Sequence, residues 1–432
     1  MNVCVYGLWH LGPVTASCLS FLGHNVIGLD SDDKNISKLL LGKNSVFEPG
    51  LDDLIVQQLK KRKLNFTSSI KEGLKNSRII WITFDTPIAQ QKSSIGVNYV
   101  IKKIKEIIPN ASVGSIFLIS SQLPVGSTRT LEAWTSKLYP KKLIKFAYSP
   151  ENLILGKSIK SFLEPSRIVV GIRDKKIKNY LKNFLSSISK NIMWISVESA
   201  EMIKHGINSF LGTSVAFANE IATICEKVGA DAMEVERGLK SEIRIGPNAY
   251  LRPGTAFSGS TLERDIVFLN TIGKSKNIKL PLLRSVKVSN DNHKLWINKK
   301  VSENFSSLNK KNISIWGLTY KANTSSQRES LIINTCEWLL KKRANLYVHD
   351  FVIEDLPLQL NNSKRVKKLK HCLDMIEIID VLIVGADYDE YKKKSKRVIS
   401  FCKKKLVIID PNSFLYSSFV NTGIKYVTVG SE

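Results

Sequence analysis

Short apolar runs alternate with stretches of helical periodicity along the first 197 residues of the chain. The apolar runs predict strands at residues 2–6, Asn25–Leu29, Ile79–Thr83, Ser115–Ser120, Lys145–Tyr148, Arg167–Ile172 and Ile192–Ser196. Helical patterns lie between them, for example at residues 98–108 and 178–188. Because strands and helices alternate, we expect a mostly parallel sheet with helices on both faces.

From Glu198 to about residue 300 the pattern is mainly helical, and one formal charge, Lys204, interrupts the stretch between Glu201 and Glu220. Apolar residues recur there at a helical period, at Ile203, Ile207, Phe210, Leu211, Val215 and Phe217. A helix that is apolar over so much of its surface is normally buried. We therefore expect a long helix in the interior of the protein.

A second alternation of strands and helices begins at Asn312. It predicts strands at Asn312–Trp316, Asn345–Val348, Val381–Val384 and Leu406–Ile409, and a helix at about Ser330–Lys342. The predicted fold class is therefore α/β, with two doubly wound, Rossmann-like domains joined by a long central helix and helical segment. The predicted domain boundaries are 1–197, 198–300 and 301–432.

The first strand runs into the turn G-L-W-H-L-G, and the second strand ends at Asp30. This is the layout of a dinucleotide-binding unit, in which Gly7 and Gly12 allow a tight turn and close helix packing. An acid at the end of the second strand suits a ribose diol and repels a 2′-phosphate, so NAD is favoured over NADP. Trp9 departs from the fingerprint, which has a glycine there, and an ordinary strand–helix corner is the alternative. We expect His10 to be a surface histidine, with a phosphate contact as the alternative.

Several predicted strands end in turns of small residues, and these turns contain Thr86, Gln122 and Glu151. Ligands of open α/β sheets bind at the carboxyl ends of the strands, so the turns are candidate sites.

The formal net charge of +26 suggests a polyanionic partner such as nucleic acid. However, the lysines come in short, separated groups without an aromatic platform or a nucleic-acid motif, so solvated faces explain them better. We predict no nucleic-acid partner, although a positive field would help to gather a diphosphate substrate.

Six scattered cysteines without a C-x-x-C pair argue against disulfides or a structural zinc site, and we predict no metal. No uncharged apolar run is long enough for a bilayer, and the N-terminus resembles a first strand more than a signal peptide. We therefore predict a cytoplasmic protein without a membrane partner.

Lys204 and Asn208 lie four residues apart and share a helical face, and the turn F-S-G-S-T-L-E-R-D ends on Asp265. A lysine in an apolar helix is costly unless it is paired or its pKa falls. We interpret the lysine, the asparagine and the turn as a reaction centre. A lysine that reaches solvent from a core helix is the alternative.

Together these motifs resemble those of the UDP-glucose/GDP-mannose dehydrogenase family, the nucleotide-sugar 6-dehydrogenases. The resemblance runs over nearly the whole chain, through G-L-x-x-L-G at Gly7–Gly12, G-H-N-V-I-G-L-D at Gly23–Asp30, F-E-P-G-L-D at Phe47–Asp52, P-V-G-S-T at Pro124–Thr128, S-P-E-N-L at Ser149–Leu153, R-I-V-V-G at Arg167–Gly171, E-S-A-E-M-I-K-H-G-I-N-S-F at Glu198–Phe210, R-I-G-P at Arg244–Pro247 and G-L-T-Y-K-A-N-T at Gly317–Thr324. It implies an N-terminal NAD domain, a central helical segment used for homodimerisation and a C-terminal domain for the nucleotide sugar. It also implies a role in polysaccharide biosynthesis.

The resemblance implies an NAD-dependent oxidation of C6 of a nucleotide sugar, with UDP favoured over GDP, from a primary alcohol to a carboxylate. The implied catalytic residues are Lys204, Asn208, Asp265, Glu151 and, at the position of the family's cysteine, Thr261. The implied cofactor-binding residues are Gly7, Leu11, Gly12, Asp30, Thr86, Gln122 and Arg328. The implied substrate-binding residues are Glu151, Asn152, Leu153, Lys204, Asn208, Phe257, Gly259 and Lys321.

The resemblance implies that Lys204 and Asn208 stabilise the alkoxide from which hydride leaves. It also implies that Asp265 takes up the hydroxyl proton, directly or through a water. The family's cysteine captures the aldehyde before the second oxidation, and Thr261 is a hindered alcohol that needs a dedicated base. The second oxidation is therefore in question. The enzyme could stop at the aldehyde, or an aldehyde hydrate formed with the help of Glu151 could be oxidised directly.

Two other classes of protein stay open. The first is a catalytically silent paralogue that binds NAD and a nucleotide sugar as a sensor or partner subunit. The second is a hydroxyacid or 6-phosphogluconate-type dehydrogenase, against which the second α/β domain from Asn312 onward argues.

Overall fold

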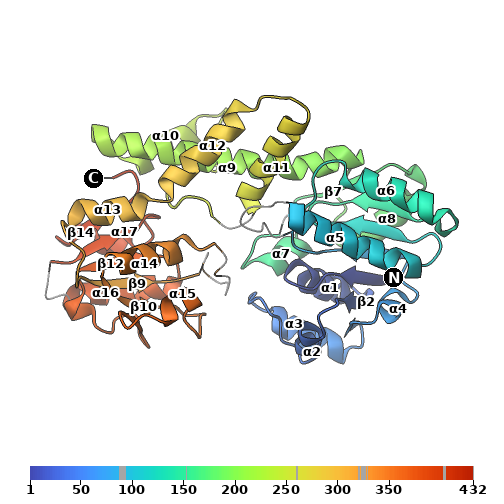
Figure 1. Ribbon diagram of the computed structural model, residues 1–432, viewed down its shortest axis with the longest axis horizontal. Helices are drawn as coiled ribbons and strands as arrows, with labels where there is room; N and C mark the ends of the chain where they lie inside the picture. The colour runs from blue at the N-terminus through green and yellow to red at the C-terminus, as the bar shows by residue number, and fades with distance from the viewer. Residues whose placement is uncertain are drawn as a thin grey trace. The chain divides into compact units, whose positions relative to one another are not determined.

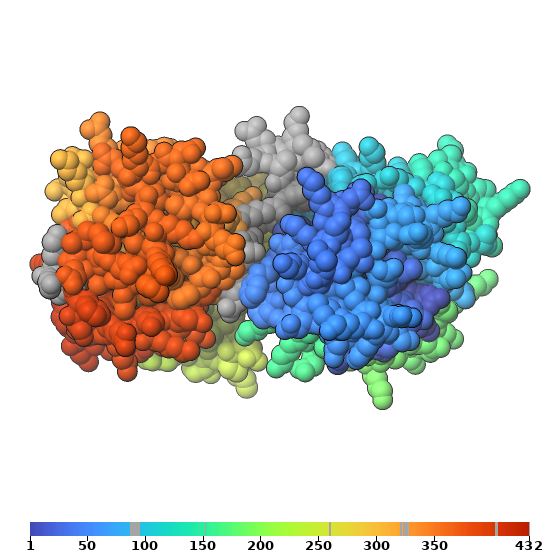
Figure 2. Space-filling view, turned by 90° about the horizontal axis from the view of Figure 1, so that it is seen from below, coloured from blue at the N-terminus to red at the C-terminus, as the bar shows by residue number. Residues whose placement is uncertain are grey.

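The computed structural model describes residues 1–86, 94–151, 153–258, 261–319, 322, 327, 329–401 and 405–431. The chain forms two compact units, residues 1–207 and 208–432. Each unit contains its own sheet (Figure 1). In Figure 2 the blue-to-cyan residues of the first unit and the orange-to-red residues of the second each form a continuous surface. The long helix α9 (Val197–Val228) crosses the boundary along the chain, so it belongs to both units.

The sheet of the first unit has the strand order β3-β2-β1-β4-β5-β6-β7-β8. Its strands are β1 Asn2–Tyr6, β2 Asn25–Leu29, β3 Leu64–Thr67, β4 Ile79–Ile82, β5 Ile116–Ile119, β6 Lys145–Tyr148, β7 Ile168–Ile172 and β8 Ile192–Ile195. All neighbouring pairs are parallel except β6 and β7, which pair antiparallel. The predicted mostly parallel sheet is therefore confirmed, and β1 to β6 have the order of a dinucleotide-binding fold.

Alternate residues of these strands face two hydrophobic cores. Val3 and Val5 of β1 pack in one core, and Cys4 and Tyr6 pack in the other. The first core is covered by α1 Leu11–Phe21, α2 Asp33–Leu40, α3 Leu51–Lys60, α7 Ser158–Leu163 and α8 Lys178–Leu185 (Figure 1). The second is covered by α4 Ile70–Leu74, α5 Ser94–Ile107, α6 Ser127–Leu138 and the start of α9. Helices therefore lie on both faces, as predicted.

The second unit contains a parallel sheet with the order β11-β10-β9-β12-β13-β14. Its strands are β9 Asn312–Trp316, β10 Asn345–His349, β11 Val366–Lys368, β12 Val381–Val384, β13 Val407–Ile409 and β14 Lys425–Val427. One face packs against α13 Trp296–Asn304, α14 Leu331–Lys341, α15 Leu358–Asn361 and the end of α9, and the other packs against α16 Asp389–Phe401 and α17 Tyr416–Phe419. The second predicted Rossmann-like domain is thus confirmed. The same unit also contains α10 Ala232–Ser241, α11 Thr261–Ser275 and α12 Pro281–His293.

Helix α9 forms as predicted, but the expectation that it lies wholly in the interior is wrong. Phe210 is 69% exposed and Phe217 is 46% exposed, whereas Lys204 and Asn208 are buried. Lysine and asparagine can be buried here because each has a bonded partner, as described below. No helix in the described part of the chain is long and apolar enough to cross a membrane.

Candidate functional site

The turn after β1 has the geometry that a dinucleotide requires. Gly7 has a φ of +102°, and its carbonyl oxygen accepts a hydrogen bond of 2.8 Å from Thr83 Oγ1. A Cβ added to Gly12 would lie 2.0 Å from the Gly7 carbonyl oxygen, so a side chain there would displace the backbone. The Leu8 amide donates to Asp30 Oδ2 at 2.6 Å. The turn, the start of α1 and the end of β2 therefore form one rigid corner, which fits a dinucleotide.

Asp30 is half-buried, and its second oxygen accepts a hydrogen bond from the Asp32 amide at 3.2 Å. A carboxylate has about four acceptor positions, so both oxygens can also accept from a ribose diol. Leu11 is the first residue of α1, and Thr86 is buried four residues beyond the end of β4. These positions fit the predicted cofactor site at the carboxyl edge of the sheet.

His10 differs from its prediction, because it is 8% exposed and does not lie on the surface. Its Nε2 lies 3.0 Å from Glu48 Oε2. Glu48 also accepts hydrogen bonds from the amides of Gly156 at 2.9 Å and Ser158 at 2.7 Å. Burial alone would raise the pKa of Glu48, but these bonds outweigh it and hold the pKa below its usual value. The buried carboxylate of Glu48 needs hydrogen-bond partners, and the buried His10 is one of them. The contacts of Glu48 thus join the dinucleotide turn to the loop beyond Glu151.

Lys204 is 6% exposed, and its ammonium is paired within the first unit. Nζ donates to the carbonyl oxygen of Glu151 at 2.7 Å and lies 3.5 Å from Glu151 Oε1. Glu151 Oε2 in turn accepts from the Leu153 amide at 2.7 Å. The ammonium carries three hydrogens and the carbonyl takes one, so the pair can also bind a third oxygen. This arrangement meets the condition that a buried lysine be paired.

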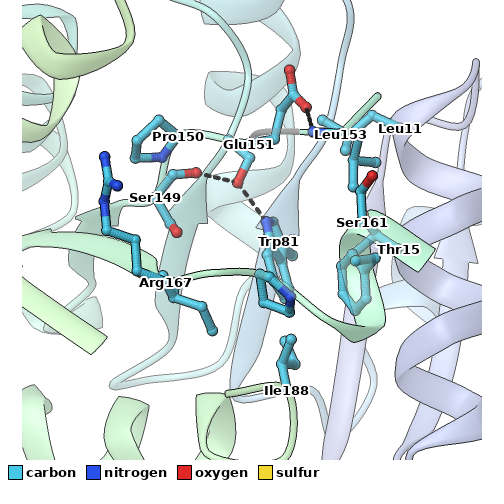
Figure 3. A pocket seen from close by; sticks show the side chains of 14 residues that line it. Leu11, Thr15, Trp81, Ser149, Pro150, Glu151, Leu153, Ser161, Arg167 and Ile188 are labelled. Atoms are coloured by element: carbon cyan, nitrogen blue, oxygen red, sulfur yellow. Dashed lines mark hydrogen bonds between the residues drawn. The ribbon is translucent and has the colours of Figure 1, made fainter. Parts of the chain in front are cut away.

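The loop that carries Glu151 is anchored at its start by hydrogen bonds, drawn as dashed lines in Figure 3. Trp81 Nε1 donates to Ser120 Oγ at 2.8 Å, and Ser120 Oγ donates to the Ser149 carbonyl oxygen at 2.5 Å. Glu151 and Leu153 lie at the rim of a cavity of about 70 Å³ beneath this loop (Figure 3). Small-molecule sites are usually about 300 Å³ or larger, so this cavity is too small for a nucleotide sugar.

Asn208 lies one helical turn after Lys204 and is bonded within the second unit. Its Nδ2 donates to Asp265 Oδ2, and both side chains are buried, with Asp265 at 0% exposure. The bond fixes which end of the amide faces the carboxylate. It leaves one hydrogen on Nδ2 for another acceptor. A fully buried Asp265 can exchange a proton with a substrate only through an intervening group.

Two further buried residues of α9 escape the sequence analysis. Glu201 is fully buried and accepts from the Gly126 amide at 2.7 Å and from the Thr128 amide at 3.0 Å, at the N-terminus of α6, where a negative charge is favourable. His205 Nε2 lies 3.0 Å from the Leu123 carbonyl oxygen, and Gln122 Nε2 lies 3.4 Å from His205 Nδ1. Because a carbonyl only accepts, Nε2 carries the hydrogen and Nδ1 accepts from Gln122. The sequence signal that could have identified these residues is a polar residue at each turn of an otherwise apolar helix.

Thr261 begins α11 and is exposed, four residues before Asp265. Phe257 is 8% exposed and packs with Ala216, Ile266 and Val286. Four predicted site residues lie outside the described residues, namely Asn152, Gly259, Lys321 and Arg328. In the turn Phe257–Asp265, the structure therefore describes the predicted site residues Phe257, Thr261 and Asp265.

The loop before Phe257 is also held by the end of β13. Asn412 Oδ1 accepts from the Thr255 amide at 2.9 Å, and Arg252 Nη2 donates to the Asn412 carbonyl oxygen at 3.0 Å. Asn412 Nδ2 lies 3.2 Å from Asp387 Oδ2. Burial, and then the charge of Asp410, raise the pKa of Asp387 to about 6. A group with a pKa in the physiological range thus contacts the residue that holds the loop.

The described cysteines do not offer a replacement for the missing thiol. Cys4, Cys18, Cys225, Cys336 and Cys372 are all buried free thiols. Burial raises the pKa of Cys18 and of Cys336 to about 12 and that of Cys372 to about 11, which disfavours the nucleophilic thiolate. Among the described residues no three or more His, Cys, Asp or Glu side chains form a group that could hold a metal.

Comparison with known proteins identifies three consecutive regions. Models of the UDP-glucose/GDP-mannose dehydrogenase family match with the NAD binding domain over residues 1–189, the central domain over 198–292 and the UDP binding domain over 314–416. Together they span most of the chain.

Individual relatives agree with the family models. A UDP-glucose 6-dehydrogenase of Rickettsia bellii is 32% identical over 445 residues, covering 100% of both chains. Another from Bacillus subtilis is 32% identical over 390 residues, covering 90% of this chain and 86% of its own. The structure of a UDP-glucose dehydrogenase from Pyrobaculum islandicum has the same fold, with a TM-score of 0.86 at 22% identity, over 100% of this chain and 98% of the other.

We predict that Asp387→Asn raises the thermal midpoint at about pH 7.5 and has little effect near pH 4. The folded-state pKa of Asp387, about 6, lies above the usual aspartate value of 3.8 that holds in the unfolded chain. Stability from this group is therefore present at low pH and is lost as the pH rises through 6. The loss is at most about 3 kcal/mol, which the neutral amide avoids. Thermal unfolding of both proteins across this pH range measures it, and an equal shift at every pH would contradict the assignment.

Proposed function

Because the chain belongs to the UDP-glucose/GDP-mannose dehydrogenase family, we propose that it oxidises the C6 alcohol of a UDP-linked sugar. It is an NAD-dependent oxidoreductase that acts on a CH–OH group. The match to the UDP binding domain and the names of the relatives favour UDP over GDP as the nucleotide. The five described cysteines are free, which suits the reducing cytoplasm that we propose as its location.

The observation that carries the proposal is the environment of Lys204. Its ammonium is 6% exposed, yet its bonds to Glu151 leave hydrogens that can bind a further oxygen. Asn208 follows one turn later on the same helix and also retains a donor hydrogen. Two donors in a buried setting are what a developing alkoxide requires, because charge interactions are strongest where water is excluded.

In the proposed first oxidation the C6 hydroxyl loses its proton while Lys204 and Asn208 stabilise the resulting oxyanion. NAD, when bound, accepts the hydride that leaves C6. Asp265 is fully buried, so we assign it to receive the proton through an intervening water and to hold the Asn208 amide in its donor orientation. The product is the C6 aldehyde.

We propose that the second oxidation is slow and proceeds through the hydrate of the aldehyde. Thr261 is exposed at the start of α11, but a threonine hydroxyl is a weak nucleophile without a base beside it. The Glu151 side chain is 30% exposed, so water can reach it. Its carboxylate takes a proton from water that adds to the aldehyde carbon. The aldehyde oxygen becomes the oxyanion of the hydrate, which Lys204 and Asn208 would stabilise, and loss of a hydride from the same carbon to a second bound NAD would give the acid.

The stoichiometry of NADH tests the proposal. With UDP-glucose and NAD we expect more than one NADH per sugar consumed but fewer than two early in the reaction, with the aldehyde or its hydrate accumulating. Thr261→Cys should raise the early ratio toward two, since a thiol traps the aldehyde efficiently. Absorbance at the NADH band and mass spectrometry of the sugar measure both quantities.

Thr261→Ser is the matched control, because it removes the branch without adding a thiol, and its ratio should stay near that of the unchanged protein. Two NADH per sugar from the start, without free aldehyde, would refute the slow second step. Measurable binding of NAD and UDP-glucose without any NADH would instead support a catalytically silent paralogue.

A second prediction concerns Lys204 itself. Lys204→Ala should lower the rate of hydride transfer by about 10²–10³-fold, because the oxyanion loses a buried charged donor. The affinity for NAD should stay within about twofold, because Lys204 is assigned to the sugar oxygen. Single-turnover NADH formation and NAD titration measure the two effects. Lys227→Ala, which removes an exposed lysine from the same helix, should leave both unchanged.

We also propose that the protein is a homodimer through α9. Phe210, Phe217, Ile224 and Val228 are between 46% and 69% exposed and recur at intervals of seven, seven and four residues. Such spacing places them on one face of the helix, and an exposed apolar stripe of this length favours a partner. A second copy of the chain would offer the same face.

Phe217→Lys should shift the protein from dimer to monomer, because a charge would be buried in the apolar contact. Mass measurement by light scattering after size-exclusion chromatography shows the shift. Val113→Lys, at an exposed apolar residue 66% accessible and away from α9, is the matched control and should leave the mass unchanged. A monomeric unchanged protein would rule out the dimer.

A further inference from the structure

The described segment of residues 251–258, called the loop below, leads into the turn that carries Thr261 and Asp265. It precedes α11 and is not part of a helix or a strand. Even so, Gly254 and Phe257 are buried. Buried backbone groups need hydrogen-bond partners, and a loop must find them outside a regular ladder. The partners of this loop are side chains from neighbouring elements.

Asn290 of α12 supplies two of these bonds to a single residue. Its Oδ1 accepts from the Phe257 amide at 2.9 Å, and its Nδ2 donates to the Phe257 carbonyl oxygen at 2.8 Å. Asn290 is 2% exposed, so water does not substitute readily for either bond. The side-chain amide thus replaces the strand partner that the loop lacks, and it fixes both peptide planes that flank Phe257.

The loop also forms hydrogen bonds at Gly254, earlier in the sequence than Phe257. The Gly254 amide donates to Asn219 Oδ1 at 2.9 Å, and the Gly254 carbonyl oxygen lies 2.8 Å from His293 Nε2. Burial holds the pKa of His293 below its usual value, so the ring is neutral and donates through Nε2. These bonds lie three residues before Phe257. Among the described contacts of this loop, those of Asn290 lie nearest to Thr261.

The Phe257 ring connects the loop to the reaction centre. A Cβ added at Gly212 would lie 3.5 Å from Phe257 Cε1, so the ring packs on α9 one turn after Asn208. The same added Cβ would lie 3.0 Å from Cδ1 of Ile266, the residue next to Asp265. A shift of the Phe257 backbone would therefore move a ring that contacts both elements bearing the Asn208–Asp265 pair.

Helix α12 is itself attached to the start of α11. Glu263 Oε1 lies 2.9 Å from Lys287 Nζ, and Glu263 Oε2 lies 3.0 Å from Lys294 Nζ. These half-buried ion pairs connect the helix of Asn290 to the turn that begins at Thr261. Helix α12, which carries Asn290, is therefore bonded both to Phe257 of the loop and to Glu263 at the start of α11.

We propose that Asn290 is a positioning residue that holds Phe257, and with it the described loop of residues 251–258, in the conformation that binds the sugar nucleotide. The inference rests on the proposed function, since it assigns Asn290 to the same site. The Asn290 amide orders the loop in the free protein, so the free energy of binding does not have to offset the entropy lost in ordering it.

The test uses Asn290→Asp, which keeps the size and the acceptor for the Phe257 amide but sets an oxygen against the Phe257 carbonyl oxygen. We expect the Kd for UDP-glucose to rise about tenfold and hydrogen exchange in residues 251–258 to accelerate. The Kd for NAD should stay within about twofold. Asn292→Asp is the matched control, since Asn292 is an exposed asparagine of the same helix, and it should change none of these.

Calorimetry measures both Kd values, and exchange is followed by mass spectrometry of peptides spanning the loop. Faster exchange with an unchanged Kd for UDP-glucose would overturn the positioning role, as would no change in either. Asn290→Ser, which is uncharged and too short for both bonds, gives the same comparison if the aspartate variant unfolds. Lack of UDP-glucose binding by the unchanged protein would overturn the proposed function and the positioning role together, whatever the exchange rates.

Discussion

The bond between the Lys204 ammonium and the Glu151 carbonyl oxygen is the interaction on which the site depends. A buried ammonium without a partner is costly enough to change its protonation state or expel it to water. The partner is a main-chain oxygen, so a substitution at Glu151 cannot remove it as an acceptor. The position of the ammonium is consequently set by the path of the loop from Ser149, which is itself fixed by the hydrogen bonds from Trp81 through Ser120. The ammonium of Lys204 is therefore held in place through the sheet of the first unit.

Helix α9 repeats this arrangement along its buried face. Glu201 binds the start of α6, His205 binds the Leu123 carbonyl oxygen, and Asn208 binds Asp265. Leaving one of these buried polar groups unpaired would cost more free energy than its hydrogen bond contributes. Each bond therefore keeps together the two segments that it joins. The helix thus anchors neighbouring segments in each unit through its buried polar residues, whereas Phe210 and Phe217 are exposed.

Much of the fold follows from the sequence, because runs such as Ile79–Ile82 and Val381–Val384 are apolar throughout, as buried parallel strands require. The exposure of Phe210 and Phe217 on α9 did not follow, since periodicity assumes that apolar residues point inward. His10 was misplaced for a different reason, because its partner Glu48 lies 38 residues away. Family resemblance proposed Lys204, Asn208 and Asp265 as site residues, but it did not give their contacts, because the partner of Lys204 lies 53 residues away and that of Asn208 lies 57 away. Asn290 matches no motif, because it acts on the backbone of Phe257, and backbone geometry leaves no trace in residue identities.

The same contacts support the proposal that a threonine at position 261 affects the second oxidation and not the first. Stabilising an oxyanion is needed in both proposed oxidations, and the two residues that we assign to it, Lys204 and Asn208, are held by bonds that do not involve Thr261. Trapping an aldehyde is needed only before the second oxidation, and it requires a nucleophile at the surface of the loop, where Thr261 is exposed. The described thiols are buried in the cores, and none can take over the task. Under the proposed function, hydride transfer and covalent capture are therefore separate tasks, and Lys204 and Asn208 are suited to the first.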